Sequence, residues 1–453
     1  MNEILWNSIL KFNLDNPADE YGFSTRLAFE NNWTIYFTKT AILEYKKFMY
    51  LAAVANEMVS PSQIVDVVWH QHLIFTNSYT DLCTLLGKRI EHIPSTHNKA
   101  EIDKFRNAKE KTTELYEQYF GKQPKEIWEF ENELTTLHLE ESNYKIESLK
   151  KMFLAAFVVS LLPVYFLIRP VLVQIGNPYF LILYILLFIF GIKLLLRYVK
   201  QASASFYDTI KWNSILLNLS PFELIFLQQN KLSFVIHGVV NNLILTHKVE
   251  IQPGRKLNLI DETLTDNLYE NCIIGIMKEY EPMPYQQLLK IAVHKPLFSQ
   301  LEKAVIRIRT AILNSKPFLS IIKRGALFLG ILLSIGCSRL ISGIVREKPI
   351  VFITITIFIF SLVVYYYFHV MVNYLFTHTI ASFFKEEKQN KVGENEWEWK
   401  YFLYGNLILA NSFVFMTQNA DRGISDSSSS GSSCSSSCGS SCGSSCGGCG
   451  GGD

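Results

Sequence analysis

Four long runs of apolar residues interrupt an otherwise mixed chain. They cover residues 152–168, 178–196, 325–345 and 350–376. A helix needs about 20 mostly apolar residues to cross the hydrocarbon core of a bilayer, so each run is a candidate span. Short segments rich in Pro, Gly or charge join the first run to the second and the third to the fourth. The pattern therefore predicts two transmembrane hairpins, since a soluble core does not accommodate four such runs in matched pairs.

Basic residues near the ends of these runs predict an orientation. One side collects Lys145, Lys150, Lys151, Arg197, Lys200, Lys323, Arg324, Lys385 and Lys388, whereas the other side has Arg169, Arg346 and Lys348. Because cytoplasmic loops carry the excess of Lys and Arg, we expect both termini in the cytoplasm. The N-terminus lacks a basic region followed by an apolar run, so we expect no cleavable signal peptide.

One charged residue, Arg339, lies inside the third run. An intramembrane charge is a candidate functional group by default. Arg339 is about one and a half turns from the outer end of its run, where a long side chain can extend to the interface, so we expect it to snorkel. No other ionisable residue lies deep in the four runs, which disfavours a transport function.

The segments outside the runs show mostly helical periodicity. In residues 1–149 the predicted helices are 40–58, 61–86, about 99–120 and one that starts at Pro124. We expect Ser60 to cap the second of these helices, with Pro61 at its first position, and Gly87 to end it. Between the hairpins, Ser220-Pro221 predicts another helix start, two short helices follow, and residues 243–250 and 256–260 read as a hairpin around Pro253-Gly254.

The fold class expected is mostly α. The six segments are a helical cytoplasmic domain (1–149), a first transmembrane hairpin (150–197), a small winged-helix-like α+β module (198–322), a second transmembrane hairpin (323–377), a juxtamembrane segment (378–422) and a disordered Ser/Gly/Cys-rich tail (423–453). The aromatic residues between Trp397 and Tyr404 form either a belt at the membrane interface or the apolar side of a helix packed on the middle module.

Composition agrees with a membrane protein. Of 453 residues, 49% are hydrophobic and only 19% are charged, against about 25% in a usual soluble domain. The 43 basic and 41 acidic residues nearly cancel, which argues against a dedicated nucleic-acid binder. The presumed wing offers only Lys248, Arg255 and Lys256, fewer clustered cations than a DNA-binding face needs. We therefore expect no nucleic-acid partner.

The chain after Gly423 consists almost entirely of Ser, Gly and Cys, a composition that cannot bury enough apolar surface to fold. Its cysteines are Cys434, Cys438, Cys442, Cys446 and Cys449. Their odd number and the expected cytosolic location argue against a disulfide framework. Four hypotheses remain: a flexible solvated arm, capture of zinc or Cu(I) by thiolates, S-acylation, or enzymatic cyclisation, since the tail resembles the core of thiazole/oxazole-modified bacterial peptides.

Candidate metal ligands gather near the middle of the N-terminal domain. They are His70, His72, Cys83 and His92. On a straight helix His70 and His72 point about 200° apart, whereas Asp66 and His70 share a face. We therefore consider a zinc site formed by His72, Cys83 and His92, with Asp66 orienting His70. The alternative is that Trp69, Tyr79 and Cys83 belong to the core and the histidines are hydrogen-bonded packing groups.

The motif around these residues carries a resemblance. The pattern V-D-x-x-W-H-x-H, then Y-x3-C and G-x-x-I-x-H, resembles the glycine-rich domain-containing protein family, best known from plants, over roughly residues 25–130. Separately, S-P-F-E-L at 220–224, the paired hairpins, residues 403–405 and the tail resemble uncharacterised bacterial membrane proteins with Gly/Cys-rich ends, although this tail is richer in Ser. The resemblances imply an architecture and a bacterial inner membrane, and no established reaction.

No nucleophile elbow, Walker loop, dinucleotide fingerprint or H-E-x-x-H motif is present in the sequence. The leading hypothesis is a non-enzymatic multi-pass membrane protein. Its N-terminal domain and middle module would bind a cytoplasmic protein partner or each other, and its Cys-rich arm would serve as a tether, metal-capture or modification segment. The alternatives are a metal-dependent enzyme that uses His70, His72 and His92, and a substrate of a Cys/Ser-modifying system.

Overall fold

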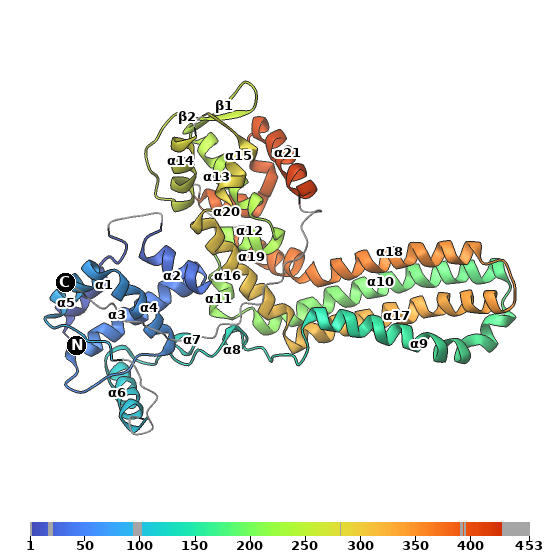
Figure 1. Ribbon diagram of the computed structural model, residues 1–453, viewed down its shortest axis with the longest axis horizontal. Helices are drawn as coiled ribbons and strands as arrows, with labels where there is room; N and C mark the ends of the chain where they lie inside the picture. Colours follow the sequence, from blue (N-terminus) through green and yellow to red (C-terminus); the bar gives the residue numbers. More distant parts are fainter. Residues whose placement is uncertain are drawn as a thin grey trace, which may run out of the picture.

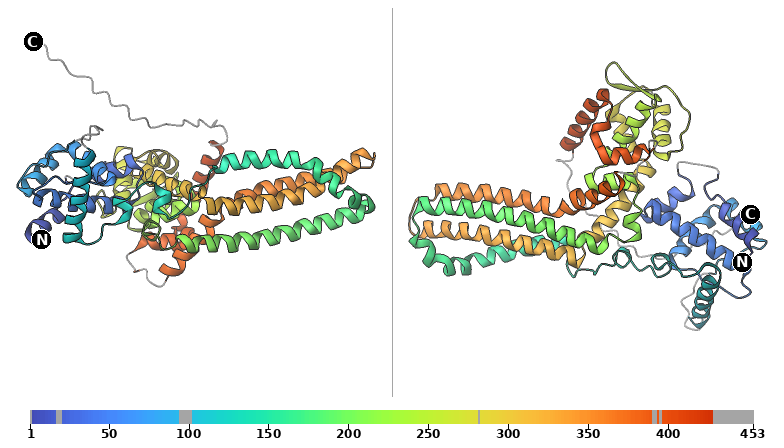
Figure 2. Two further views of the ribbon diagram at one scale, coloured as in Figure 1. Left: turned by 90° about the horizontal axis from the view of Figure 1, so that it is seen from below. Right: turned by 180° about the vertical axis from the view of Figure 1, so that it is seen from behind.

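The computed structural model describes residues 2–16, 21–93, 102–280, 282–389, 393 and 396–427. The described chain is mostly helical, as predicted. A bundle of four long helices extends from one side of two smaller helical units, and the N-terminal domain lies farthest from the bundle (Figure 1). Figure 2 shows the same arrangement from two further directions. The predicted disordered tail was to start at residue 423, but residues 423–427 continue the last helix, which ends at Ser427; the rest of the tail and its five cysteines lie outside the described residues.

The N-terminal domain consists of short helices around one core. They are α1 (Glu3–Lys11), α2 (Phe23–Asn31), α3 (Ile35–Val54), α4 (Gln63–Ile74), α5 (Thr76–Leu86), α6 (Ile102–Phe120), α7 (Lys125–Trp128) and α8 (Glu133–Thr136). Gly87 ends α5 in the left-handed conformation, with φ of 74°, as predicted. The core is strongly aromatic, and its fully buried side chains include Phe23, Tyr45 and Phe48.

The structure corrects the predicted helices of this domain in several places. The helix expected over 40–58 is α3, which runs from Ile35 to Val54, and the helix expected from Pro124 is two separate short helices, α7 and α8. Ser62 caps α4, because its Oγ accepts the backbone N–H of Val65 at 3.2 Å, whereas the predicted cap, Ser60, pairs with the Thr112 hydroxyl through its backbone. The single helix expected over 61–86 is broken at Phe75. The φ and ψ of Phe75, −87° and 65°, leave the helical region, and its ring packs on Phe23.

The bundle confirms the two predicted hairpins. Its helices are α9 (Ile146–Gln174), α10 (Asn177–Ile210), α17 (Lys316–Val345) and α18 (Val351–Tyr374). In the described chain, four helices are long and apolar enough to cross a membrane, and α18 continues through the π-helix η2 (Leu375–Ile380) into α19 (Ala381–Lys388). Helix α17 packs against the other three. Gly336 of α17 leaves room for the Tyr184 hydroxyl, which donates to the Leu332 carbonyl at 3.1 Å.

The middle module combines helices with a small antiparallel sheet. In chain order its elements are α11 (Ser214–Leu217), α12 (Pro221–Gln229), α13 (Leu232–Leu245), β1 (Val249–Gln252), β2 (Lys256–Leu259), α14 (Leu268–Glu279), β3 (Met283–Pro284), α15 (Tyr285–Ala292) and α16 (Pro296–Leu313). Ser220 forms the capping box of α12 with Glu223. The predicted hairpin is present, but β1 starts only at Val249 because α13 extends to Leu245. The sequence did not indicate β3, which pairs with β2 over two residues.

The segment after the bundle packs on the middle module. It contains α20 (Trp397–Tyr404), the 3-10 helix η3 (Gly405–Ile408) and α21 (Asn411–Ser427). The Tyr401 hydroxyl donates to the Phe234 carbonyl at 2.9 Å, and the backbone N–H of Ala410 donates to Oδ1 of Asn241 at 2.7 Å. Of the two predicted roles for these aromatic residues, packing on the module is therefore the one observed.

The N-terminal domain and the middle module contact each other directly. Helix α2 packs along α16, and the side-chain amide of Gln300 donates to the Trp33 carbonyl at 2.6 Å. Arg307, about two turns further along α16, donates to the Asn31 carbonyl at 2.5 Å. These bonds occupy the C-terminal end of α2, so the two units are joined by defined polar contacts as well as by apolar packing.

Candidate metal centre

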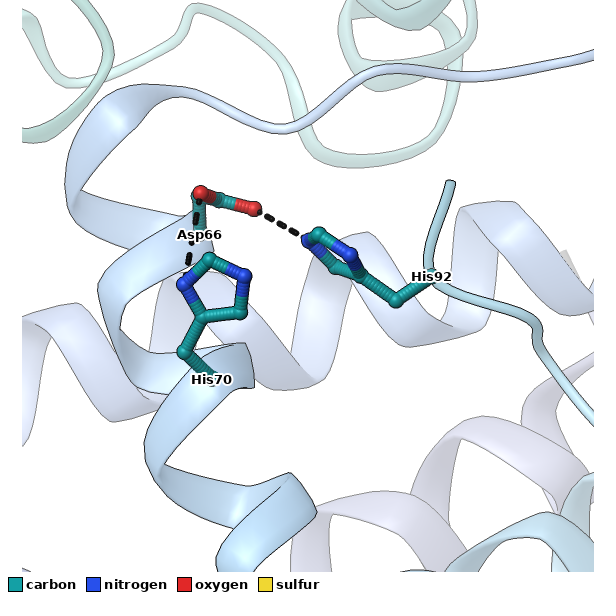
Figure 3. A group of neighbouring side chains, drawn as sticks. All are labelled: Asp66, His70 and His92. Atoms are coloured by element: carbon teal, nitrogen blue, oxygen red, sulfur yellow. Dashed lines mark hydrogen bonds and ion pairs between the residues drawn. The ribbon is translucent and has the colours of Figure 1, made fainter. Parts of the chain in front are cut away.

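Three candidate ligands converge at one end of α4. Asp66 and His70 are one turn apart on this helix, and His92 comes from the segment after α5 (Figure 3). Nε2 of His92 lies 2.9 Å from Oδ1 of Asp66, and Nδ1 of His70 lies 3.7 Å from Oδ2 of the same carboxylate. One ligand atom from each of the three residues lies within 4.8 Å of the others. The carboxylate thus stands between two imidazoles.

The position of His92 is fixed by aromatic residues of the same sequence motif. The indole N–H of Trp69 donates to the Tyr79 hydroxyl at 3.2 Å, and that hydroxyl donates to the carbonyl of Ile90. Burial raises the pKa of Tyr79 to about 12, so the hydroxyl keeps its proton at neutral pH. The Trp69 ring also meets the His92 ring edge to face, with centroids 4.7 Å apart. Trp69 and Tyr79 therefore hold the His92 segment against Asp66.

The cluster is open to solvent on one side. The exposed fraction is 17% for the His92 side chain, 34% for Asp66 and 56% for His70. A cleft of about 580 Å³ adjoins the cluster; Asp66, Trp69 and His92 line its wall, together with Lys88 and Glu91. A small molecule or water can therefore approach the carboxylate and His92 without any movement of the core.

His72, predicted from the sequence as a metal ligand, lies in the core instead. Its side chain is fully buried, with Nδ1 2.8 Å from the Tyr45 hydroxyl and Nε2 3.0 Å from Oγ of Ser78. Burial lowers the pKa of His72 to about 4, which keeps the ring neutral at physiological pH. Both ring nitrogens have hydrogen-bond partners, so neither is directed at the Asp66 cluster.

Cys83 also belongs to the core. It is buried on α5, in the same apolar cluster as Tyr79. The structure therefore brings together two of the four histidine and cysteine candidates, His70 and His92, and places His72 and Cys83 elsewhere. Asp66, expected only to orient His70, is instead central to the cluster. The spacing of four residues between Asp66 and His70 was the sequence signal for this pair.

Two imidazoles and one carboxylate form a donor set that suits divalent transition metals. Imidazole ligands favour zinc, iron, nickel and copper, and a set of three protein ligands leaves coordination positions for water or a substrate. The tail cysteines, the second predicted thiolate set, lie outside the described residues. In the described part of the chain, Asp66, His70 and His92 are the group whose ligand atoms lie close enough to share one ion.

Comparisons with known proteins give a partial match. The chain is 32% identical over 91 residues to glycine-rich domain-containing protein 1 of Arabidopsis thaliana and 29% identical over 92 residues to glycine-rich domain-containing protein 2 of the same plant. Each match covers 19% of this chain and only 11% to 12% of the relative's length. No family model and no solved structure matches the chain. The matches support the resemblance of the N-terminal region to these proteins and extend no further.

Proposed function

We propose that this protein is a multi-pass membrane protein of the bacterial inner membrane whose N-terminal domain is a metal-binding module. The convergence of Asp66, His70 and His92 carries the proposal, because the three ligand atoms already lie within 4.8 Å of one another. Zinc is the metal that we expect, since two imidazoles and a carboxylate match its preferred ligands. The binding module would act as a scaffold for a cytoplasmic partner and not as an enzyme.

Zinc binding to the purified full-length chain tests this function. The five tail cysteines are first replaced by serine, so that their thiolates cannot compete for the ion. Equilibrium dialysis should then find about one zinc per chain, and His92→Ala should abolish tight binding. The control variant is His294→Ala, which removes an exposed histidine of the middle module and should leave binding unchanged. Equal zinc binding by the His92→Ala chain would refute the proposed site.

The orientation in the membrane is a separate part of the proposal. We expect both termini in the cytoplasm, because the basic residues around the four long helices are concentrated at the ends nearer the folded units. Single cysteines at positions 348 and 388 report the two sides, each in a chain whose five tail cysteines are serine and whose Cys83, Cys272 and Cys337 are replaced by alanine. A membrane-impermeant maleimide should label Lys348→Cys from outside intact spheroplasts and spare Lys388→Cys. The reverse result would invert the topology.

The cleft beside Asp66 and His92 supports a second candidate, a metal-dependent enzyme. Its volume of about 580 Å³ gives a substrate access to any coordination position that the three ligands leave open. A metal ion in such a site can lower the pKa of a bound water and activate it as a nucleophile. Nitrophenyl ester and phosphate substrates test this candidate. Zinc-dependent turnover lost in His92→Ala would favour the enzyme, and its absence would favour the scaffold.

A further inference from the structure

A second site lies at the opposite end of the molecule, where the helical hairpins turn. A partly open cavity of about 450 Å³ lies there between the start of α10, the end of α17 and the turn that leads into α18. Three cationic residues line it: Arg339, Arg346 and Lys348. The cavity is therefore formed by both hairpins, and its cationic residues come from α17 and the following turn.

Arg339 was predicted to snorkel to the interface, but the structure holds it in place. Its side chain is buried, with a residue exposure of only 9%, and it donates to the carbonyls of Leu172 and Ile175, the second at 2.9 Å. Its guanidinium carbon lies 4.9 Å from the centre of the Phe180 ring. These contacts with the end of α9 and the start of α10 hold the positive charge in the wall of the cavity.

The charges of the lining residues favour an anion. Among the described lining residues, three carry a positive charge and none is acidic; Glu347 lies between Arg346 and Lys348 in sequence but does not line the cavity. Bringing like charges together near a low-dielectric region is unfavourable, and a bound anion relieves their repulsion. Charged groups at this depth in a membrane protein are costly and commonly mark a binding function.

The other residues that line the cavity are mostly apolar, and they favour binding of an amphiphilic anion over a soluble one. Phe180, Leu181 and Phe352 form an apolar wall next to the cations, and Phe352, 75% exposed, continues this wall onto the outer surface of the bundle. Arg339 precedes the last residue of α17 by six positions, about 9 Å along the helix axis. In a bilayer spanned by α17, this is the depth of the boundary between headgroups and acyl chains.

We propose that this cavity binds the phosphate headgroup of one anionic phospholipid, with an acyl chain of that lipid along the Phe352 side. The proposal rests on the membrane placement proposed above and is independent of the metal site. Arg339 supplies a fixed guanidinium for the phosphate, and Arg346 and Lys348, both exposed on the turn, complete the charge around it.

Native mass spectrometry of the full-length chain, released from nanodiscs of mixed composition, tests this site. When the nanodiscs contain equal amounts of phosphatidylglycerol and phosphatidylcholine, the chain should retain one phosphatidylglycerol molecule in preference to phosphatidylcholine. The test variant is Arg346→Gln with Lys348→Gln, which leaves the buried Arg339 contacts in place. Two surface cations near a headgroup predict a loss of affinity on the order of 10- to 30-fold.

The matched control is Lys323→Gln with Arg324→Gln, which removes two exposed cations from the other end of α17. It should change phosphatidylglycerol retention less than about threefold. An equal loss of phosphatidylglycerol retention in both double variants, or no preference of the wild-type chain for phosphatidylglycerol, would refute the proposed lipid site. Displacement of the lipid by millimolar inorganic phosphate would also overturn it, in favour of a soluble anion. Failure of the chain to enter nanodiscs would count against the membrane placement itself.

Discussion

Oε1 of Glu223 accepts the backbone N–H of Ile35, 188 residues earlier in the chain, at 3.0 Å. The other carboxylate oxygen accepts the backbone N–H of Ser220 at 2.7 Å. Ile35 is the first residue of α3, and Ser220 caps α12. One fully buried carboxylate therefore accepts hydrogen bonds from backbone N–H groups at the starts of two helices, one in each unit. Glu223 thereby fixes how the N-terminal domain meets the middle module.

Replacing Glu223 with Gln should destabilise the chain by about 1–3 kcal/mol, because the amide nitrogen cannot accept a hydrogen bond, whereas either carboxyl oxygen can accept one whether or not the group is protonated. Burial raises the pKa of Glu223 above its ordinary value, so its contribution to stability is greatest at low pH and falls as the pH rises through the folded-state pKa. The difference in melting temperature between wild type and Glu223→Gln should therefore narrow from acidic to neutral pH. Melting curves in detergent at several pH values measure it.

The control for this pH dependence is Glu117→Gln, which changes an exposed carboxylate of α6. It should alter the melting temperature little and with no comparable dependence on pH. A Glu223→Gln chain as stable as wild type across the range would show that Glu223 does not join the two units.

His72 is predicted to be structural. His72→Leu removes both imidazole hydrogen bonds and leaves the buried Tyr45 hydroxyl without its 2.8 Å partner, which should cost about 2–4 kcal/mol. The matched variant two residues earlier, His70→Leu, changes a side chain that is 56% exposed and should cost less than about 0.5 kcal/mol. Chemical unfolding followed by tryptophan fluorescence compares the two. Equal costs would contradict the buried placement of His72.

Gly238 is required where α20 packs on α13. A Cβ at position 238 would lie 2.4 Å from a ring carbon of Tyr401, so Gly238→Ala forces the ring to move and should cost about 1–3 kcal/mol. Gly275→Ala, on α14, is the matched control because nothing lies within 4 Å of the added Cβ. That change should stabilise the chain by about 0.5–1 kcal/mol through helix propensity. Opposite shifts in melting temperature are expected, and a stabilising Gly238→Ala would refute the packing.

The tail hypotheses are separated by the intact mass of the protein purified from its native host. Reduction and alkylation of an unmodified chain should add eight alkyl groups, because the chain has eight cysteines. Resistance of the tail cysteines to alkylation, together with a mass difference, would instead identify the chain as a substrate for a Cys-modifying or Ser-modifying system. We predict the unmodified mass, which is the result that a solvated thiol arm requires.

Much of the fold follows from local sequence signals. Run length alone locates the four long helices, and Ser220 with Glu223 has the spacing of a capping box. The start of α4 was misplaced because Ser60 and Ser62 are both good caps, and Pro61 is favoured at a first helical position. The choice depends on Thr112, 52 residues away from Ser60, which binds the Ser60 backbone. The local preferences of residues for helix-capping positions cannot predict a contact with a residue so far away in the chain.

The candidate site was predictable in part for the same reason. Helical spacing pairs Asp66 with His70, and the motif includes His92, so these three residues were all singled out. The exclusion of His72 depends on Tyr45, which approaches it from 27 residues earlier in the chain. The approach of His92 to Asp66 likewise depends on the bond from Tyr79 to the Ile90 carbonyl. A contact with a residue outside the motif, Tyr45, therefore excludes His72, whereas contacts within the motif bring His92 to Asp66.

The donor set of the bound metal tests the central claim most directly. X-ray absorption at the zinc edge, recorded on the serine-tail chain with one equivalent of zinc, should show nitrogen and oxygen ligands at about 2.0–2.2 Å, with scattering from two imidazoles. His92→Ala, which should no longer bind zinc tightly, should lose this two-imidazole spectrum, and His72→Gln should leave it unchanged. A sulfur shell near 2.3 Å, the distance of a cysteine ligand, would contradict the site formed by Asp66, His70 and His92.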